Sequence, residues 1–385
     1  MADSSMPPVA PKPSSLLGYH RVLSPNAGIK VSPLCLGAMS FGTAWKDFMG
    51  ECSKERAFEI LDTFYSLGGN FIDTANDYQD EESEKIIGEW MKLKGNRDQM
   101  VIATKYTSGY RTHNRAEEPL QSNYVGNSMK SMHLSVAKSL EKLQTSYIDV
   151  LYLHWWDFTT SVEEVMIGLN ALITSGKVLY LGVSDTPAWI VVKANEYARA
   201  HGLRPFSVYQ GKWNAGFRDI EREILPMCRD QGMAITPWAP LGEGKFKAAA
   251  QRSGADGSIR ATMAEEHDIK VSEALERIAD RKSTTLHSVA IAYLLHKAPY
   301  VFPIVGQRDP KHLLANVKAL GVSLSVQEIR EIDSVVPFDA GFPLNFLFGP
   351  EHRTDMTASD VFWTQVAAHV DVPPAQAVIP ARSAV

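Results

Sequence analysis

The chain has 385 residues, a formal net charge of −5, 45% hydrophobic residues and 22% charged residues. This composition is that of a globular protein with enough apolar side chains to fill a large core, and it excludes an intrinsically disordered chain. The small acidic excess offers no basic surface to nucleic acid or to an anionic membrane, so we expect neither as a partner.

The cysteines and the chain start constrain the cellular setting. Cys35, Cys52 and Cys228 form no CxxC pair, and no histidine stands near them at zinc-ligand spacing, so we expect neither disulfides nor a bound metal. Residues 1–17 lack the regions of a signal peptide and are predicted to form a loose tail. No apolar run of about 18 residues is present, so the sequence predicts a cytoplasmic protein.

Short apolar runs alternate with longer amphipathic stretches along most of the chain, which predicts βα units and a parallel sheet. In chain order the eight candidate strands are Pro33–Gly37, Asn70–Asp73, Val101–Lys105, Asp149–His154, Tyr180–Ser184, Phe206–Gln210, Ala234–Trp238 and Val301–Gly306. The candidate helices are Lys54–Leu67, Glu82–Lys92, Ser128–Leu143, Val162–Ser175, Pro187–His201, Asp219–Asp230, Leu286–His296 and Pro310–Leu320. Eight such pairs favour closure into a (β/α)₈ TIM barrel, with a doubly wound sheet as the alternative.

Three stretches fall outside this alternation: Thr107–Asn127, Leu241–Val271 and the segment from Phe342 onwards. The first two follow the third and seventh predicted strands, on the face where barrel enzymes hold their sites, so we expect them to cover a substrate. The predicted organisation is a tail at 1–17, a barrel at 18–341, and a C-terminal extension at 342–385 with an appended helix and a Pro/Ala-rich tail.

Polar side chains stand at the carboxyl ends of five predicted strands: Asp73, Lys105, His154, Ser184 and Gln210. Each alone has an ordinary structural explanation, such as a turn, a solvated strand end or a hydrogen-bonded core residue. In a parallel barrel, however, these ends share one rim, so residues far apart in sequence converge on one mouth.

Tyr78, five residues after Asp73, completes a set that makes chemical sense. A free tyrosine has a pKa of about 10, and a neighbouring Lys105 ammonium is expected to lower that pKa. Asp73 would keep Lys105 charged, and a neutral His154 could donate a hydrogen bond to a carbonyl oxygen. Such a site exchanges a proton with a carbonyl compound but has no nucleophile, so it requires a hydride donor.

These residues resemble the tetrad of the aldo-keto reductases, which is Asp, Tyr, Lys and His in this order and on these elements. The matching motifs are residues 73–78, the strand that ends in Lys105, and residues 151–154, within a resemblance that runs from about Gly18 to Phe338. The resemblance implies a (β/α)₈ barrel, an NADPH cofactor, and catalysis by Asp73, Tyr78, Lys105 and His154.

The cofactor site can be approached independently. No GxGxxG motif follows the first strand, so a Rossmann site is unsupported. The segment Gly306–Pro310 instead joins the last strand to a helix, with Asp309 as its N-cap and Pro310 at the first helical position. Free backbone N–H groups beside Arg308 suit a phosphate, although an ordinary capped helix with a surface arginine is the alternative.

The resemblance extends the cofactor site. It places the adenosine 2′-phosphate near Gly306, Arg308, His312 and Asn316, although His312 stands where glutamine is usual, so its role stays open. Asp185 likewise stands where asparagine is usual. The remaining residues that the resemblance assigns to the cofactor are Gly37, Met39 and Asp73 near the nicotinamide, Ser184 and Gln210 at its carboxamide, Trp213 stacked on its ring, and Pro240, Leu241, Gly244 and Lys245 around the pyrophosphate.

Within the family, residues 47–50, 155–160 and 182–189 resemble the fungal NADP-dependent aryl-alcohol dehydrogenases and the norsolorinic acid reductase-like enzymes. Trp45, Trp155, Trp156 and Phe217 fall on or near the rim loops, where aromatic walls favour a flat aromatic substrate. Each could instead pack a loop onto the barrel. A benzaldehyde and benzyl alcohol pair is the first hypothesis, and an aromatic polyketide ketone is the second.

Two other functions stay open from the sequence. Some barrels of this family are non-catalytic NADPH-binding auxiliary subunits of membrane channels, and an intact tetrad does not exclude this. A hydrolase that uses His154 and Asp73 would lack a Ser or Cys nucleophile motif. The sequence predicts no oligomeric state.

Overall fold

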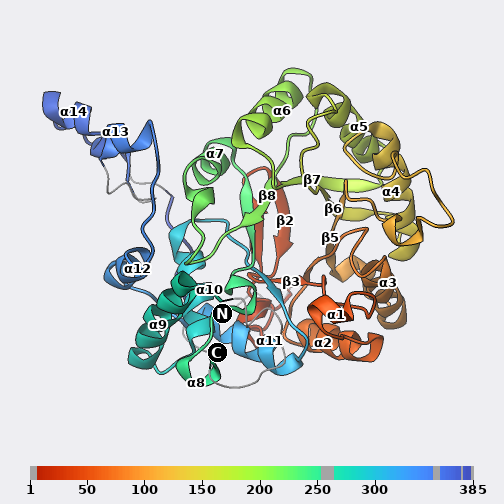
Figure 1. Cartoon of the computed structure of the whole chain (residues 1–385), viewed down its shortest axis with the longest axis horizontal. Helices are drawn as coiled ribbons and strands as arrows, with labels where there is room; N and C mark the ends of the chain where they lie inside the picture. Colours follow the sequence, from red (N-terminus) through yellow and green to blue (C-terminus); the bar gives the residue numbers. More distant parts are fainter. Residues whose placement is uncertain (1–6, 253–263, 350–355, 374–375, 383–385) are drawn as a thin grey trace.

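The computed structural model describes residues 7–252, 264–349, 356–373 and 376–382. Its centre is a parallel sheet in the order β10-β3-β4-β5-β6-β7-β8-β9, which curls into a ring (Figure 1). The strands are β3 (Cys35–Gly37), β4 (Phe71–Asp73), β5 (Val101–Tyr106), β6 (Ile148–Leu153), β7 (Val178–Ser184), β8 (Val208–Lys212), β9 (Ala234–Trp238) and β10 (Ile304–Gly306).

The ring closes just before β10. Ile235 of β9 forms a parallel bridge with Val301, and its backbone N–H donates to the Tyr300 carbonyl at 2.9 Å. The Phe302 N–H donates to the Ile235 carbonyl, also at 2.9 Å. This bridge joins the first and last strands of the sheet order, so the (β/α)₈ barrel is confirmed and the doubly wound sheet is excluded.

The helices that follow the strands form the outer layer of the barrel (Figure 1). Serines at the N-caps of three of them, Ser53, Ser128 and Ser161, each accept a hydrogen bond from a backbone N–H of the first turn. The helices that match the predicted ones are α2 (Lys54–Ser66), α3 (Glu82–Lys94), α4 (Met129–Lys142), α5 (Val162–Thr174), α6 (Ala188–Ala200), α7 (Ile224–Gln231), α10 (Leu286–Lys297) and α11 (Pro310–Val317).

Two predicted helices differ at their ends. A separate 3₁₀ turn, Asp219–Glu221, precedes α7, because a continuous helix from Asp219 would place the ring of Pro226 against a carbonyl of the preceding turn. At Ile224 the helix start puts Pro226 in the first turn, where it is tolerated. The last turn predicted for α11 is a 3₁₀ turn, Lys318–Gly321.

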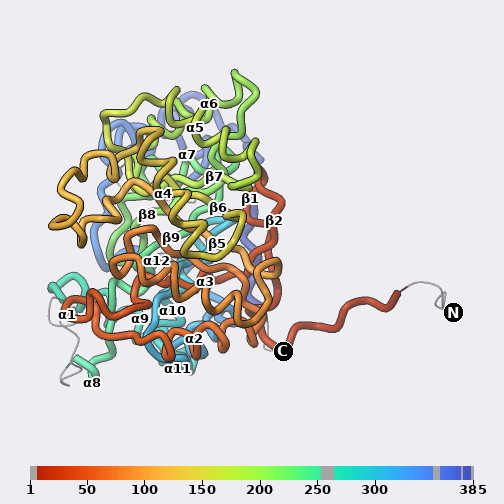
Figure 2. Tube along the Cα trace, turned by 90° about the vertical axis from the view of Figure 1, so that its right-hand side faces the viewer, coloured from red at the N-terminus to blue at the C-terminus, as the bar shows by residue number. Residues whose placement is uncertain are grey.

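Several elements were not predicted. A hairpin of β1 (Arg21–Ser24) and β2 (Ala27–Val31) lies across the amino-terminal end of the barrel (Figure 2). Helix α9 (Glu266–Arg281) begins inside the stretch 241–271, which we expected to be a loop. Residues 253–263 of that stretch lie outside the described part of the chain. Helix α12 (Val326–Asp333) follows the barrel. None of these elements belongs to a βα pair, so the alternation gave no signal for them.

The hairpin seals one end of the barrel. Leu23, Ala27 and Val31 of the hairpin belong to the same buried cluster as Phe71 and Tyr152 of the barrel strands. The barrel interior is therefore packed with side chains, as in other barrels of this kind, and does not form a pore. The carboxyl ends of the strands lie at the opposite end of the barrel, which we call the mouth.

The ends of the chain pack differently from the barrel helices. Leu17, at the end of the predicted tail, is fully buried, and the Ser15 hydroxyl donates to the Leu67 carbonyl at 2.8 Å. In the C-terminal extension, α13 (Leu344–Phe348) and α14 (Phe362–Ala367) project from the barrel (Figure 1). Among the described residues, no helix combines the length and the apolarity that crossing a bilayer requires.

Candidate active site

A fully buried lysine lies at the centre of the mouth. Lys105 is the fifth residue of β5, and its Nζ lies 2.6 Å from Oδ1 of Asp73, the last residue of β4. The same Nζ donates to the Thr74 carbonyl at 2.7 Å and to the Tyr78 hydroxyl oxygen at 3.3 Å. Burial, the largest single influence, lowers the pKa of Lys105, but Asp73 and Tyr78 together raise this pKa above its ordinary value, so the lysine is an ammonium ion.

The pKa of Tyr78 corrects one expectation. The pKa of Tyr78 is raised to about 12, because burial raises it by more than the Lys105 ammonium lowers it. The expectation from the sequence considered the effect of the Lys105 charge on this pKa but not the effect of burying the phenol. At neutral pH Tyr78 is therefore a protonated phenol beside a fixed positive charge, which makes it a proton donor whose conjugate base the ammonium stabilises.

His154 follows β6 and faces the tyrosine ring edge-on, with the two ring centroids 6.0 Å apart. Its Nδ1 lies 3.3 Å from the Ser108 hydroxyl and 4.0 Å from Oδ1 of Asp77. Burial lowers the pKa of His154 to about 3, with the Lys105 charge as a further cause, so the imidazole is neutral at physiological pH. The structure thus brings Asp73, Tyr78, Lys105 and His154 together at one mouth.

The loop that carries Tyr78 is held from behind by buried ion pairs. Lys142 of α4 lies 3.1 Å from Glu81 and 2.8 Å from Glu84, and it also donates to the Asn76 carbonyl at 2.9 Å. Gln79 holds the front of the loop, since its amide donates to the Met39 carbonyl at 3.0 Å. Sequence reasoning missed these groups, because a single sequence does not reveal which charges pair after folding.

Three residues that the sequence assigns to the nicotinamide lie at or near the carboxyl ends of their strands. Ser184 Oγ is buried and forms no hydrogen bond of ordinary geometry with any described residue, so it is available to a ligand. Gln210 donates to Oδ2 of Asp73 at 2.8 Å. Gly37 is paired with Asp73 on one side and Gly306 on the other, where an added Cβ would lie 2.8 Å from Ile304 Cγ2.

The assignment of Trp213 needs correction. Trp213 is 0% exposed and its indole N–H donates to Glu221 at 2.9 Å, so its ring offers no face to a cofactor. Trp238, the last residue of β9, is instead half-buried at the rim, and its N–H donates to Asp185 at 3.2 Å. Trp238, and not Trp213, is therefore the tryptophan whose ring reaches the rim. In the sequence, the position of Trp238 at the carboxyl end of a predicted strand was the feature that could have indicated a rim residue.

At the phosphate end, Asp309 caps α11 as expected, since its carboxylate accepts from the Lys311 N–H at 2.8 Å. Arg308 is exposed and extends over Gly50, where an added Cβ would lie 1.7 Å from its Nη1. Asn316 is buried and donates to the Gln307 side chain at 3.3 Å, whereas His312 is exposed on the first turn of the helix.

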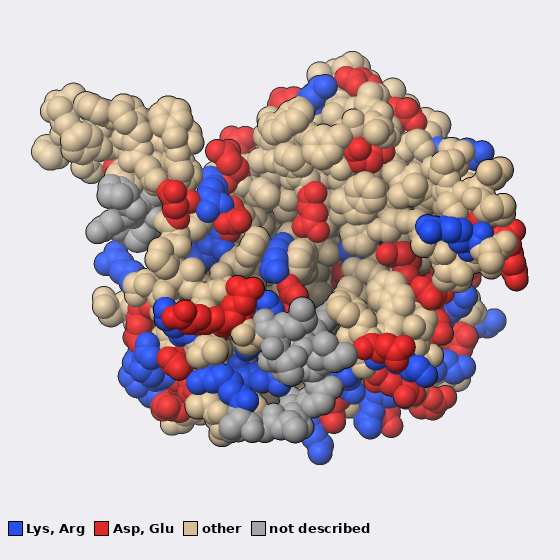
Figure 3. Space-filling view, in the orientation of Figure 1, with Lys and Arg blue, Asp and Glu red and all other residues tan. Residues whose placement is uncertain are grey.

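The segment after β9 forms the opposite wall. Gly242–Gly244 is a 3₁₀ turn, Pro240 is buried, and Leu241 is half-buried. Lys245, the expected phosphate partner, lies 3.6 Å from Asp268 of α9, so its ammonium already faces a carboxylate. Acidic and basic side chains intermingle on the mouth face, with no patch of one sign (Figure 3).

The predicted substrate residues separate into two groups. The Trp45 ring stands edge-on to Tyr78 at a centroid distance of 6.3 Å, and its N–H donates to Asp80. The Trp155 N–H donates to Ser108 at 3.3 Å, and Phe217 is 38% exposed below the Lys212 ammonium. Trp156, by contrast, is buried in the main hydrophobic core, and this packing explains it without a substrate contact.

A closed barrel whose mouth holds an ammonium, a protonated phenol and a neutral imidazole has the groups to donate a proton to a carbonyl oxygen. The fold and the mouth therefore place this chain among the (β/α)₈ barrel enzymes. The comparisons narrow this class. Residues 33–337 match the aldo/keto reductase family, and the chain belongs to that family.

Named relatives cover almost the whole chain. Norsolorinic acid reductase A of Aspergillus parasiticus is 54% identical over 372 residues, which are 96% of this chain and 95% of the relative. Aryl-alcohol dehydrogenase [NADP(+)] of Phanerodontia chrysosporium is 51% identical over 382 residues, 96% and 97% of the two chains. A putative aryl-alcohol dehydrogenase of Saccharomyces cerevisiae is 51% identical over 345 residues, 88% and 92%. The predicted family is confirmed, and the chain is an oxidoreductase.

The carboxyl of Asp77 predicts a pH dependence of stability. Burial raises the pKa of Asp77 to about 6, whereas an unfolded aspartate titrates near ~3.9. The folded state therefore binds a proton more tightly, and this stabilisation is present below pH ~4 and lost as the pH rises through ~6. Relative to the wild type, Asp77→Asn should gain about 1–3 kcal/mol in unfolding free energy between pH 4 and pH 7.

Urea unfolding of both proteins at the two pH values measures this change. Asp47→Asn, at an exposed position on α1 (Lys46–Met49), serves as the control and should follow the wild-type pH profile. Identical profiles for Asp77→Asn and the wild type would show that Asp77 titrates normally in the folded protein.

Proposed function

We propose that this protein interconverts aromatic aldehydes and aryl alcohols of the benzyl type, with NADP(H) as the hydride carrier and Tyr78 as the proton donor and acceptor. The observation that carries the proposal is the contact of the Tyr78 hydroxyl with the buried Lys105 ammonium at 3.3 Å. At neutral pH the Tyr78 phenol is protonated. The contact places beside it an ammonium that stabilises the anion formed when the phenol gives up its proton.

The residues present fit the cofactor. The buried Ser184 Oγ and the amide of Gln210 suit the carboxamide, and Trp238 offers a ring at the rim. Arg308, beside the capped start of α11, suits the 2′-phosphate. A bound NADPH would supply a hydride to the carbonyl carbon.

The chain's own groups handle the oxygen and its proton. The neutral His154 has its Nδ1 beside Ser108, and its Nε2 forms no hydrogen bond with any described residue, so it can orient the carbonyl oxygen. As the carbonyl carbon is reduced, that oxygen becomes basic and takes the proton of Tyr78. Lys105 then stabilises the phenolate, and Asp73 keeps Lys105 in position. In the reverse direction the phenolate accepts the alcohol proton.

The aromatic rim supports a flat substrate. Trp45, Trp155 and Phe217 are each partly exposed near the mouth, and Trp45 stands directly against Tyr78. Stacking and apolar burial against these rings favour an aryl group over an aliphatic chain. A ketone of an aromatic polyketide is the second candidate, since the norsolorinic acid reductase of A. parasiticus is 54% identical.

Removing one hydroxyl tests the role of Tyr78. Tyr78→Phe should lower kcat by about 10²- to 10⁴-fold, the usual contribution of a general acid, while NADPH affinity stays within about twofold. Stopped-flow turnover and fluorescence titration with NADPH measure the two quantities. Tyr147→Phe, which removes a hydroxyl at the opposite end of a strand from the mouth, is the matched control. Normal turnover by Tyr78→Phe would end the proton-transfer proposal.

The proposed contact of Arg308 with the 2′-phosphate can be distinguished from the general effect of removing a positive charge near the cofactor. Arg308→Ala should weaken NADPH about tenfold or more and leave NADH almost unchanged, because only NADPH carries the 2′-phosphate. Lys311→Ala, which removes a neighbouring exposed cation in the first turn of α11, should have a smaller effect. Equal losses for NADPH and NADH in Arg308→Ala would remove the 2′-phosphate assignment.

A substrate panel distinguishes the two candidate reactions. We expect NADPH oxidation to be fastest with substituted benzaldehydes, slower with aryl ketones that resemble polyketides, and slowest with aliphatic aldehydes of equal size. A preference for the ketones in kcat/KM would favour the second candidate. No turnover with any of them, despite tight NADPH binding, would favour a non-catalytic nucleotide-binding role.

A further inference from the structure

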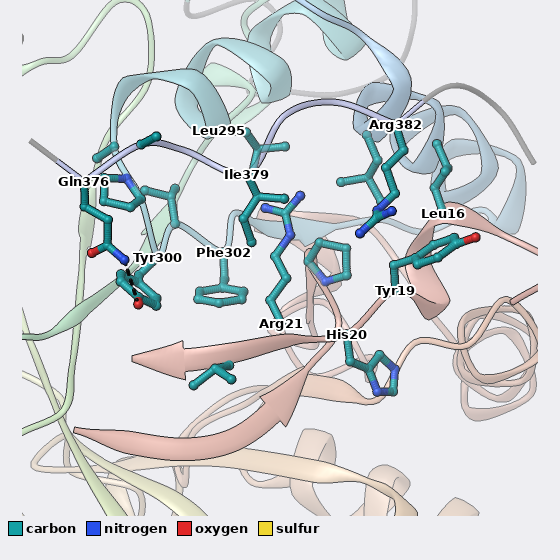
Figure 4. A pocket seen from close by; sticks show the side chains of 17 residues that line it. Leu16, Tyr19, His20, Arg21, Leu295, Tyr300, Phe302, Gln376, Ile379 and Arg382 are labelled. Carbon is teal, nitrogen blue, oxygen red and sulfur yellow. Dashed lines mark hydrogen bonds between the residues drawn. The ribbon is translucent and has the colours of Figure 1, made fainter. Parts of the chain in front are cut away.

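A cavity of about 390 Å³ lies at the amino-terminal end of the barrel, away from the mouth (Figure 4). Its floor is formed by Arg21 of β1 and by Tyr300 and Phe302, which precede β10. Its roof is the C-terminal segment 376–382, in which the Gln376 amide donates to the Tyr300 hydroxyl at 3.1 Å. Because the candidate catalytic residues stand at the carboxyl ends of the strands, this cavity is a separate site.

The charges in the cavity have one sign. Arg21 and Arg382 line it, and no aspartate or glutamate is among its described lining residues. Figure 4 shows the guanidinium of Arg21 rising from the strand toward the C-terminal segment and that of Arg382 descending toward Tyr19. Arg382 packs over the Tyr19 ring at 4.4 Å.

Neither arginine forms an ion pair with a described residue, which sets the half-buried Arg21 apart from other poorly exposed arginines of the chain. Arg97, Arg111 and Arg218 each contact a carboxylate, at 2.8, 2.6 and 2.9 Å. Burial, together with the charge of Arg382, lowers the pKa of Arg21 to about 10. Arg21 is half-buried and Arg382 is exposed, and their like charges line one cavity, which makes the cavity suited to an anion.

The walls of the cavity define the rest of the ligand. Phe302 lies flat beneath the cavity, and Leu295 and Ile379 close it from above (Figure 4). Its volume falls within the range of small-molecule sites, which are mostly apolar with a few placed polar groups. Planar guanidinium groups match the geometry of a carboxylate, and the apolar walls match a flat ring.

We propose that this cavity is a binding site for a small aryl carboxylate, with Arg21 and Arg382 holding the carboxylate and the Phe302 face receiving the ring. The site does not depend on the reaction proposed for the mouth. Its ligand joins the hairpin to the C-terminal segment, and by binding only the folded protein it stabilises the fold.

Isothermal titration of the full chain with benzoate tests the proposal. We expect binding that Arg21→Gln and Arg382→Gln each weaken at least tenfold, because each removes one charge-assisted partner. Arg330→Gln, at an exposed arginine of α12 without an ion pair to a described residue, should bind as the wild type does. Benzamide, which is neutral and has the same shape, should bind at least tenfold more weakly than benzoate.

Thermal unfolding without ligand checks that the variants fold. Since both substitutions relieve charge repulsion, the variants should unfold at or above the wild-type temperature. Benzoate binding that persists in the double variant Arg21→Gln/Arg382→Gln would belong to the mouth and would overturn the proposal. If inorganic phosphate binds in a manner that depends on both arginines and benzoate does not bind, the proposal that the ligand is an aryl carboxylate is overturned.

Discussion

The buried ion pair of Lys105 and Asp73 is the interaction on which the mouth depends. Transferring a lysine from water to a site with 0% exposure is unfavourable unless its charge is paired and its protons are bonded. The 2.6 Å contact with Asp73 meets the first condition, and the Thr74 carbonyl helps to meet the second. Gln210 donates a hydrogen bond to the other carboxylate oxygen of Asp73, so side chains from three strands meet at one carboxylate.

A second group of charged side chains lies behind this ion pair and holds the loop that carries Tyr78. The loop between β4 and α3 has left-handed backbone at Gln79 and at the two residues after it, a conformation that side chains other than glycine adopt reluctantly. Lys142 with Glu81 and Glu84 holds this loop from the helix side. Tyr78 is therefore positioned by packing and ion pairs formed far from the reacting atoms, which keeps its hydroxyl next to the ammonium.

The sequence predicted the parts of the structure that repeat. Buried parallel strands are short apolar runs, and their polar ends must share a rim, so the convergence of Asp73, Lys105 and His154 followed from topology. Features that depend on solvent exposure did not follow. Sequence could not show that Trp213 is buried against a carboxylate, or that burial outweighs a nearby charge in setting the pKa of Tyr78. Elements outside the repeat, such as the hairpin and α9, had no period to reveal them.

The described residues near both chain ends meet on the barrel face that lies away from the mouth. Leu16 and Tyr19 line one cavity with Ile379 and Arg382, and the hairpin lies beside them (Figure 4). This arrangement has a practical consequence for handling the protein. A tether attached where the described residues near the chain ends lie would start from the barrel end opposite the mouth, so immobilised enzyme would keep its mouth oriented toward solution.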